Sequence, residues 1–110
     1  MPKFLFEVTY TDEGLLGLAA DGAARRQRDA KAAFKSLGGK VESMYFCFGD
    51  ADVIVIADLP DNVSAAAVSM MTSSTGLTVG KTTPLLTIDE IDGAIEKMGA
   101  AKYRPPGGGL

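Results

Sequence analysis

The sequence contains no histidine, no tryptophan and only one cysteine among its 110 residues. Without histidine, the chain lacks the commonest general base, the commonest metal ligand and the side chain that titrates near neutral pH. The single cysteine, Cys47, excludes an internal disulfide and is typical of a protein from a reducing compartment. We therefore expect no metal site and no cofactor, and we expect a cytoplasmic protein.

Long apolar runs and a positive net charge are also missing. No stretch of about 18 apolar residues occurs, so no membrane span is predicted, and no signal peptide is expected because the N-terminus lacks a small-residue cleavage site. The net charge of −3 and a pI near 4.8 argue against nucleic acid as the main partner. With 46% apolar and 23% charged residues, the composition excludes a disordered chain and predicts one globular domain.

Hydrophobic periodicity predicts four strands and three helical regions in the order β-α-β-β-α-β, followed by a terminal helix. The strands are expected over 3–10, 41–48, 51–58 and 77–86. The helical regions are expected over 12–37 with a break at Gly22, over 62–76, and over 88–98 after a capping box at Thr87. This order is that of a ferredoxin-like α+β fold with a four-stranded antiparallel sheet and an additional C-terminal helix.

The chain is predicted to divide into a domain over 1–99 and a flexible tail over 100–110. The tail contains Pro105, Pro106 and a run of glycines, which do not support a packed element. Within the domain, the helix over 62–76 is expected to bury one apolar stripe. That stripe is predicted to consist of Val63, Ala66, Ala67, Met70 and Met71.

The strands carry more apolar residues than one buried sheet face requires. The residues predicted to point away from the helices are Leu5, Val41, Tyr45, Cys47 and either Val53 and Val55 or Ile54 and Ile56. Leaving such a surface in water is a liability. Burying about 400 Å² of it is worth about 10 kcal/mol before the costs of association. We therefore predict a homodimer, or a higher oligomer built on it, in which two sheets pack face to face.

Five short phrases occur in order along the chain: TDEG at 11–14, LGGKV at 37–41, FGDADVI at 48–54, PDN at 60–62 and TTPLLT at 82–87. In this order and spacing the chain resembles the GYD domain family over residues 3–98. The resemblance implies a ferredoxin-like domain of the kind that pairs into dimeric α+β barrels, in a small bacterial protein. The family has no determined function, so no catalytic residues carry over.

The family is named for a glycine, a tyrosine and an aspartate in the hairpin between the second and third strands. In this sequence Gly49 and Asp52 match that signature, while Ala51 occupies the position where the tyrosine is usual. If that tyrosine contributes to a ligand site in the family, this chain has an altered or lost site.

Four residues are candidates for a catalytic or binding role. Asp52, at the start of an apolar strand, could act as a catalytic base or could only bond nearby backbone N–H groups. Cys47 could be a nucleophile beside a cation, but it reads more simply as a small buried apolar residue. Tyr45, together with Tyr10 if the first strand faces the other way, could line a pocket between subunits or only pack in an interface.

A basic stripe on the long helical region is a further candidate. It consists of Arg25, Arg28, Lys31 and Lys35, at spacings of three and four residues along a helix. Such a stripe could bind an anionic ligand or surface, or it could be an ordinary solvated helix face.

Three hypotheses of function follow from these residues. The leading one is a homo-oligomeric module that binds a small apolar or aromatic molecule between the sheet and the helices. The alternative is a cofactor-independent enzyme of the dimeric α+β barrel type, with Asp52 as its base and Tyr45 orienting the substrate. The third is a regulatory or interaction subunit that uses the tail or the basic stripe as its contact.

Overall fold

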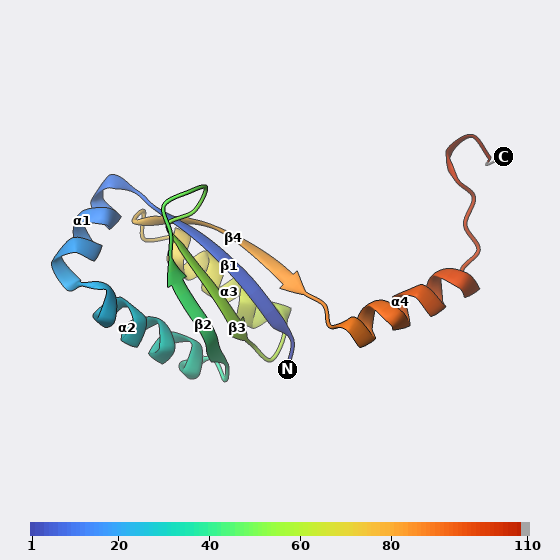
Figure 1. Cartoon of the computed structure of the whole chain (residues 1–110), viewed down its shortest axis with the longest axis horizontal. Helices are drawn as coiled ribbons and strands as arrows, with labels where there is room; N and C mark the ends of the chain where they lie inside the picture. The colour runs from blue at the N-terminus through green and yellow to red at the C-terminus, as the bar shows by residue number, and fades with distance from the viewer. Residues whose placement is uncertain (109–110) are drawn as a thin grey trace.

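The computed structural model describes residues 1–108 of the chain. The elements follow the predicted order (Figure 1). They are β1 (Lys3–Tyr10), α1 (Asp12–Asp21), α2 (Ala23–Ser36), β2 (Lys40–Phe46), β3 (Val53–Asp58), α3 (Asn62–Ser73), β4 (Thr78–Leu85), α4 (Ile88–Ala100) and a short 3₁₀ turn, η1 (Pro106–Gly108). The last two residues of the predicted tail, 109–110, lie outside the described residues.

The four strands form one antiparallel sheet in the order β2-β3-β1-β4. This order confirms the predicted ferredoxin-like α+β fold. The central strand β1 pairs along its length with both neighbours, so that Phe6 lies between Val55 of β3 and Thr82 of β4. The predicted break between the first two helices is confirmed at Gly22, whose φ of 82° lies in the region that glycine adopts most readily.

The hydrophobic core lies between one face of the sheet and the helices. The buried residues of this core are Phe4, Phe6, Val53, Val55 and Ala57 from the sheet, Leu59 after β3, Phe34 from α2, and Ala65 and Val68 from α3. The rings of Phe6 and Phe34 pack edge to face with their centroids 5.2 Å apart. The sequence left open whether Val53 and Val55 or Ile54 and Ile56 point away from the helices. Because Val53 and Val55 are buried, it is Ile54 and Ile56 that point away.

The opposite face, which we call the open face, carries an apolar patch. Leu5 lies opposite Ile56, and Tyr45 lies opposite Ile54 with 71% of its surface exposed. The prediction that Val41 belongs to this face is wrong. An irregularity in the β2–β3 pairing between Val41 and Ser43 inserts one residue, and the inserted residue turns Val41 toward the core.

The predicted inner stripe of α3 is also wrong. Val63 and Met70 are 78% and 72% exposed, while Ala65 and Val68 are buried. The cause is polar: the Ser69 and Thr82 hydroxyls bond to each other, and the Thr78 hydroxyl donates to the Thr72 carbonyl at 2.8 Å. These hydrogen bonds hold Ser69 and Thr72 of α3 against β4, which leaves Met70 facing outward and Met71 only 49% exposed.

The last helix, α4, extends away from the rest of the molecule (Figure 1). The radius of gyration is 17.8 Å, against about 13 Å for a compact chain of this length. The apolar side chains of α4 are therefore left in water: Ile88, Ile91, Ile95 and Met98 are between 43% and 81% exposed. Among residues 1–108, no helix is both long and apolar enough to cross a membrane.

Candidate functional site

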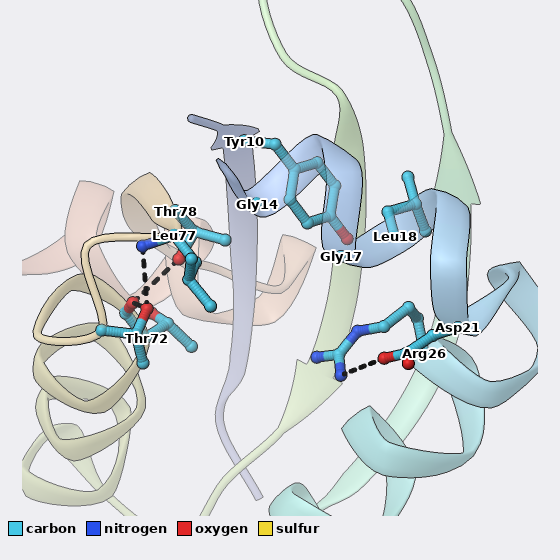
Figure 2. Close-up of a pocket in the computed structure, with 10 residues that line it drawn as sticks. Tyr10, Gly14, Gly17, Leu18, Asp21, Arg26, Thr72, Leu77 and Thr78 are labelled. Carbon is cyan, nitrogen blue, oxygen red and sulfur yellow. Dashed lines mark hydrogen bonds and ion pairs between the residues drawn. The ribbon is translucent and has the colours of Figure 1, made fainter. Parts of the chain in front are cut away.

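A cavity of about 290 Å³ opens between α1, the end of β1 and the connection from α3 to β4. We call it the α1 cavity. Figure 2 shows Tyr10 reaching from β1 toward α1, with Arg26 and Asp21 on one side of the space and Thr72 and Thr78 on the other. The residues that line it are Tyr10, Gly14, Gly17, Leu18, Asp21, Arg26, Thr72, Thr75, Leu77 and Thr78.

Backbone hydrogen bonds hold the start of α1 against the α3–β4 connection. Thr11 is the N-cap of α1, and its Oγ1 accepts from the N–H of Gly14 at 3.2 Å. The Thr11 N–H donates to the Leu77 carbonyl at 3.0 Å, and its hydroxyl donates to the Gly76 carbonyl at 3.0 Å. Thr11 therefore caps α1 and also fixes two walls of the cavity relative to each other.

Two glycines one turn apart give the α1 wall its shape. A Cβ atom at Gly14 would overlap the carbonyl oxygen of Leu77 and would lie 3.1 Å from the ring of Tyr10. A Cβ atom at Gly17 would meet nothing within 4 Å. Gly14 therefore permits the close approach of α1 to the connection, and Gly17 leaves the space beyond it open.

The polar groups of the α1 cavity are mostly paired with one another. Nη1 of Arg26 lies 3.2 Å from Asp29 and 3.8 Å from Asp21, so the guanidinium is balanced by two carboxylates. The Leu77 N–H donates to the Thr75 hydroxyl at 3.1 Å. The rest of the cavity lining is the side chain of Tyr10 together with aliphatic side chains.

Beside the α1 cavity, a groove of about 260 Å³ lies between α2 and α3, which we call the helix groove. Its floor is the core face of the sheet, and its walls include Ala30, Ala33 and Phe34 from α2 and Val68 and Met71 from α3. The residues that line both spaces are Tyr10, Arg26, Thr72, Thr75 and Thr78. The two spaces therefore adjoin each other at Tyr10, and we call them together the depression.

The side chains of the four sequence-predicted site residues do not line one space, although Tyr10, Asp52 and Cys47 are neighbours and the Cys47 N–H donates to the Asp52 carbonyl at 2.8 Å. Tyr10 lies on the helix side of the sheet and lines the depression, whereas Tyr45 lies on the open face. Asp52 and Cys47 line neither described space. The Asp52 carboxylate accepts a hydrogen bond from the Tyr10 N–H at 2.8 Å, and the half-buried Cys47 thiol donates to the Ala51 carbonyl at 3.0 Å. A catalytic base at Asp52 and a nucleophile at Cys47 stay hypotheses.

Sequence reasoning missed most of the residues that build the cavity. Gly17, Arg26 and Thr78 were not singled out, because each is ordinary in its own element. The sequence did contain one signal for the cavity, the two glycines at i and i+3 on one face of α1. Glycine destabilises a helix, so two of them on the same face suggest that the space beside that face is used. Within residues 1–108, no three acidic or cysteine side chains gather into a group that could hold a metal ion.

Comparison with known proteins gives one match. The model of the GYD domain matches residues 4–95, which run from β1 into α4 and include the whole depression. Neither a curated protein nor a solved structure matches the chain.

Proposed function

We propose that this chain, which belongs to the GYD domain family, is a homo-oligomeric module that binds a small apolar or aromatic molecule in the α1 cavity. The observation that carries the proposal is the α1 cavity itself, with a volume of about 290 Å³ and one aromatic wall. Its size is close to the lower end of the range for small-molecule sites, roughly 300–1,000 Å³.

The chemistry of the walls supports a ligand with an apolar body. Tyr10, Leu18 and Leu77 offer a ring and two aliphatic surfaces. An aromatic ring bound against Tyr10 would gain an offset-stacked or edge-to-face contact. Because Arg26 already has two carboxylate partners, the cavity offers little net charge for recognising an ionic group.

The open face supports the homo-oligomer. Its apolar patch is formed by Leu5, Tyr45, Ile54 and Ile56. Contiguous exposed apolar surface of this kind marks an interaction site in soluble proteins. A second copy presenting the same patch would cover it symmetrically.

The proposal assigns no catalytic step. The carboxylate of Asp52 is engaged by the backbone of Tyr10, and it lies outside the described spaces. An enzyme that uses Asp52 as its base would need this bond to break on substrate binding. A regulatory or interaction subunit would need no ligand in the cavity.

Filling the cavity from Gly17 tests the proposal. Gly17→Leu places an aliphatic side chain into open space, and Ala19→Leu adds the same side chain at an exposed position of α1 that does not line the cavity. The probe is 1-anilinonaphthalene-8-sulfonate, titrated by fluorescence. Because this dye also binds exposed apolar surface, the readout is the difference between the two variants. We expect Gly17→Leu to lose a saturable binding phase that Ala19→Leu retains, and equal binding by both variants would reject the cavity as the site.

A further inference from the structure

The α4 helix has its own start signal and an apolar stripe that nothing in residues 1–108 covers. Its capping box is complete: the Glu90 N–H donates to the Thr87 hydroxyl at 3.0 Å, and the Thr87 N–H donates to the Glu90 carboxylate at 2.9 Å. The stripe runs along one side of the helix from Ile88 through Ile95 to Met98. An isolated helix of 13 residues is marginal in water, so this stripe needs a surface to pack on.

The helix groove is a surface of the matching kind. It is an apolar channel between two helices, and such channels bind the apolar stripe of a third helix through anchors at i, i+3 and i+7. Its wall extends onto the molecular surface at Met71, which is 49% exposed. The small residues Ala30 and Ala33 on the α2 wall permit a close helix approach.

The charges of the two elements are complementary. Four acidic residues and one basic residue occur in α4, whereas α2 has five basic residues and one acidic residue. Three of the acidic residues, Asp89, Asp92 and Glu96, recur at helical spacing beside the apolar stripe. The groove itself is lined by Arg26, which is already paired with Asp29 and Asp21. The positive charge available to a docked α4 is therefore that of Arg25 and Arg28, which belong to the predicted basic stripe on the exposed side of α2.

The start of α4 directs it away from the groove of its own chain. Only Leu86 separates β4 from Thr87, the extended N-cap of α4. This junction lies at the end of the sheet where Leu85 pairs with Lys3, and the groove reaches the opposite end, where Thr78 pairs with Tyr10. Figure 1 shows α4 continuing outward from β4.

We propose that α4 of one copy docks in the helix groove of a second copy, with its apolar stripe on the groove and its acidic side beside α2. The exchange is reciprocal under two-fold symmetry, so each copy gives and receives one helix. Because the groove shares Tyr10 and four further lining residues with the α1 cavity, the docked helix lies next to the ligand site. The inference rests on the homo-oligomer of the proposed function and does not depend on the ligand.

Cross-linking between mixed copies tests this directly. Both chains carry Cys47→Ser, one also carries Met98→Cys in α4, and the other carries Met71→Cys in the groove. With a short bismaleimide, we expect a product of twice 11.5 kDa, several-fold above that obtained when Val63→Cys replaces Met71→Cys. Val63 lies on the same helix as Met71, but it is 78% exposed and does not line the groove. A yield no higher than that of the Val63→Cys control would overturn the proposal.

Reversing the charges of α4 and α2 supplies a second test, which distinguishes exchange between copies from α4 folding back onto its own chain. One variant reverses α4 (Asp89→Lys, Asp92→Lys, Glu96→Lys), and the other reverses α2 (Arg25→Glu, Arg28→Glu). The α4 reversal is built into the chain with Met98→Cys, and the α2 reversal into the chain with Met71→Cys. Either reversed chain, mixed with an unreversed partner, brings like charges together, whereas mixing the two reversed chains restores attraction. We expect the cross-link to be lost for each variant alone and recovered on mixing. A further chain that carries both Met71→Cys and Met98→Cys would show that α4 folds back if it cross-links only within itself.

The outcomes separate this inference from the proposed function. A protein that is dimeric by mass but gives no cross-link from α4 to the groove overturns the exchange and leaves the homo-oligomer. A monomer by mass overturns both. The ligand is tested separately, by the dye difference between Gly17→Leu and Ala19→Leu.

Discussion

The Asp52 carboxylate lies 2.8 Å from the backbone nitrogen of Tyr10 and accepts its hydrogen bond. The N–H of Asp52 in turn donates to the Val8 carbonyl at 2.8 Å. Together these bonds extend the attachment of β1 to the hairpin beyond the last ladder pair, Val8 with Val53. Asp52 therefore fixes the end of β1 from which the Tyr10 side chain enters the α1 cavity.

Removing this acceptor is expected to destabilise the fold. Asp52→Ala leaves the half-buried Tyr10 N–H without its partner and should lower the free energy of unfolding by about 1–3 kcal/mol. Asp52→Asn retains a side-chain oxygen that can accept, so its loss should be smaller. Urea unfolding of the three proteins measures both differences. Equal midpoints for Asp52→Ala and the wild-type protein would contradict a positioning role for this carboxylate.

Most of the fold could be predicted because its signals are local. Thr11, Asp61 and Thr87 each precede a helix in the sequence, and each accepts a backbone hydrogen bond at the predicted helix start. The rotation of α3 could not be predicted, because hydrophobicity alone favours Met70 facing inward. The bond between Ser69 and Thr82 joins different elements and has no signature in the helix itself.

The site was less predictable than the fold for a similar reason. Tyr10 was predicted to line a pocket only if β1 faced the other way and brought it beside Tyr45, but it lines the α1 cavity from the helix side, with partners from distant elements. Arg26 and Thr78 line the same cavity only after α1 has been tied to the α3–β4 connection through Thr11 and Leu77. Likewise, the α4 helix was predicted from its capping box, whereas its position away from the body of the molecule was not.

The two glycines of α1 are expected to respond oppositely to the same substitution. Gly14→Ala forces a methyl group into the Leu77 carbonyl and should destabilise the fold by about 2 kcal/mol or more. Gly17→Ala meets no atom and should stabilise α1 by about 0.5–1 kcal/mol, because alanine favours the helix. Thermal unfolding of the pair is the measurement. A destabilised Gly17→Ala would show that the space beside α1 is not open.

A pH dependence is expected from the N-cap of α3. The Ser64 N–H donates to the Asp61 carboxylate at 2.8 Å, and this bond lowers the pKa of Asp61 below its ordinary value of 3.8. A group whose pKa is lowered by folding stabilises the protein above its unfolded pKa, and that contribution is lost as the pH falls through the folded pKa. Asp61→Asn keeps a capping oxygen without the charge.

The free energy of unfolding of the wild-type protein should therefore fall more steeply below about pH 4 than that of Asp61→Asn. At pH 7 the wild-type protein should be the more stable of the two. Denaturant unfolding at a series of pH values between about 2.5 and 7 checks this, and parallel curves for the two proteins would exclude a contribution from Asp61.

The open face offers the sharpest prediction about assembly. Tyr45 is 71% exposed in the apolar patch, on the edge strand β2, so Tyr45→Glu should not disturb the folded chain. Two copies packed through this face would bring the new carboxylates into a water-excluded interface, where an unpaired charge costs several kcal/mol. We therefore expect the wild-type protein at twice its chain mass of 11.5 kDa, with dissociation shifted to at least about 100-fold higher concentration by Tyr45→Glu.

Val63→Glu is the matched control for this experiment, because Val63 is 78% exposed on α3 and away from the open face. Analytical ultracentrifugation at micromolar concentration measures the mass of each protein. A control that dissociates as readily as Tyr45→Glu would place the contact elsewhere on the molecule. A wild-type protein that sediments at 11.5 kDa would leave the open face without a second copy to cover it.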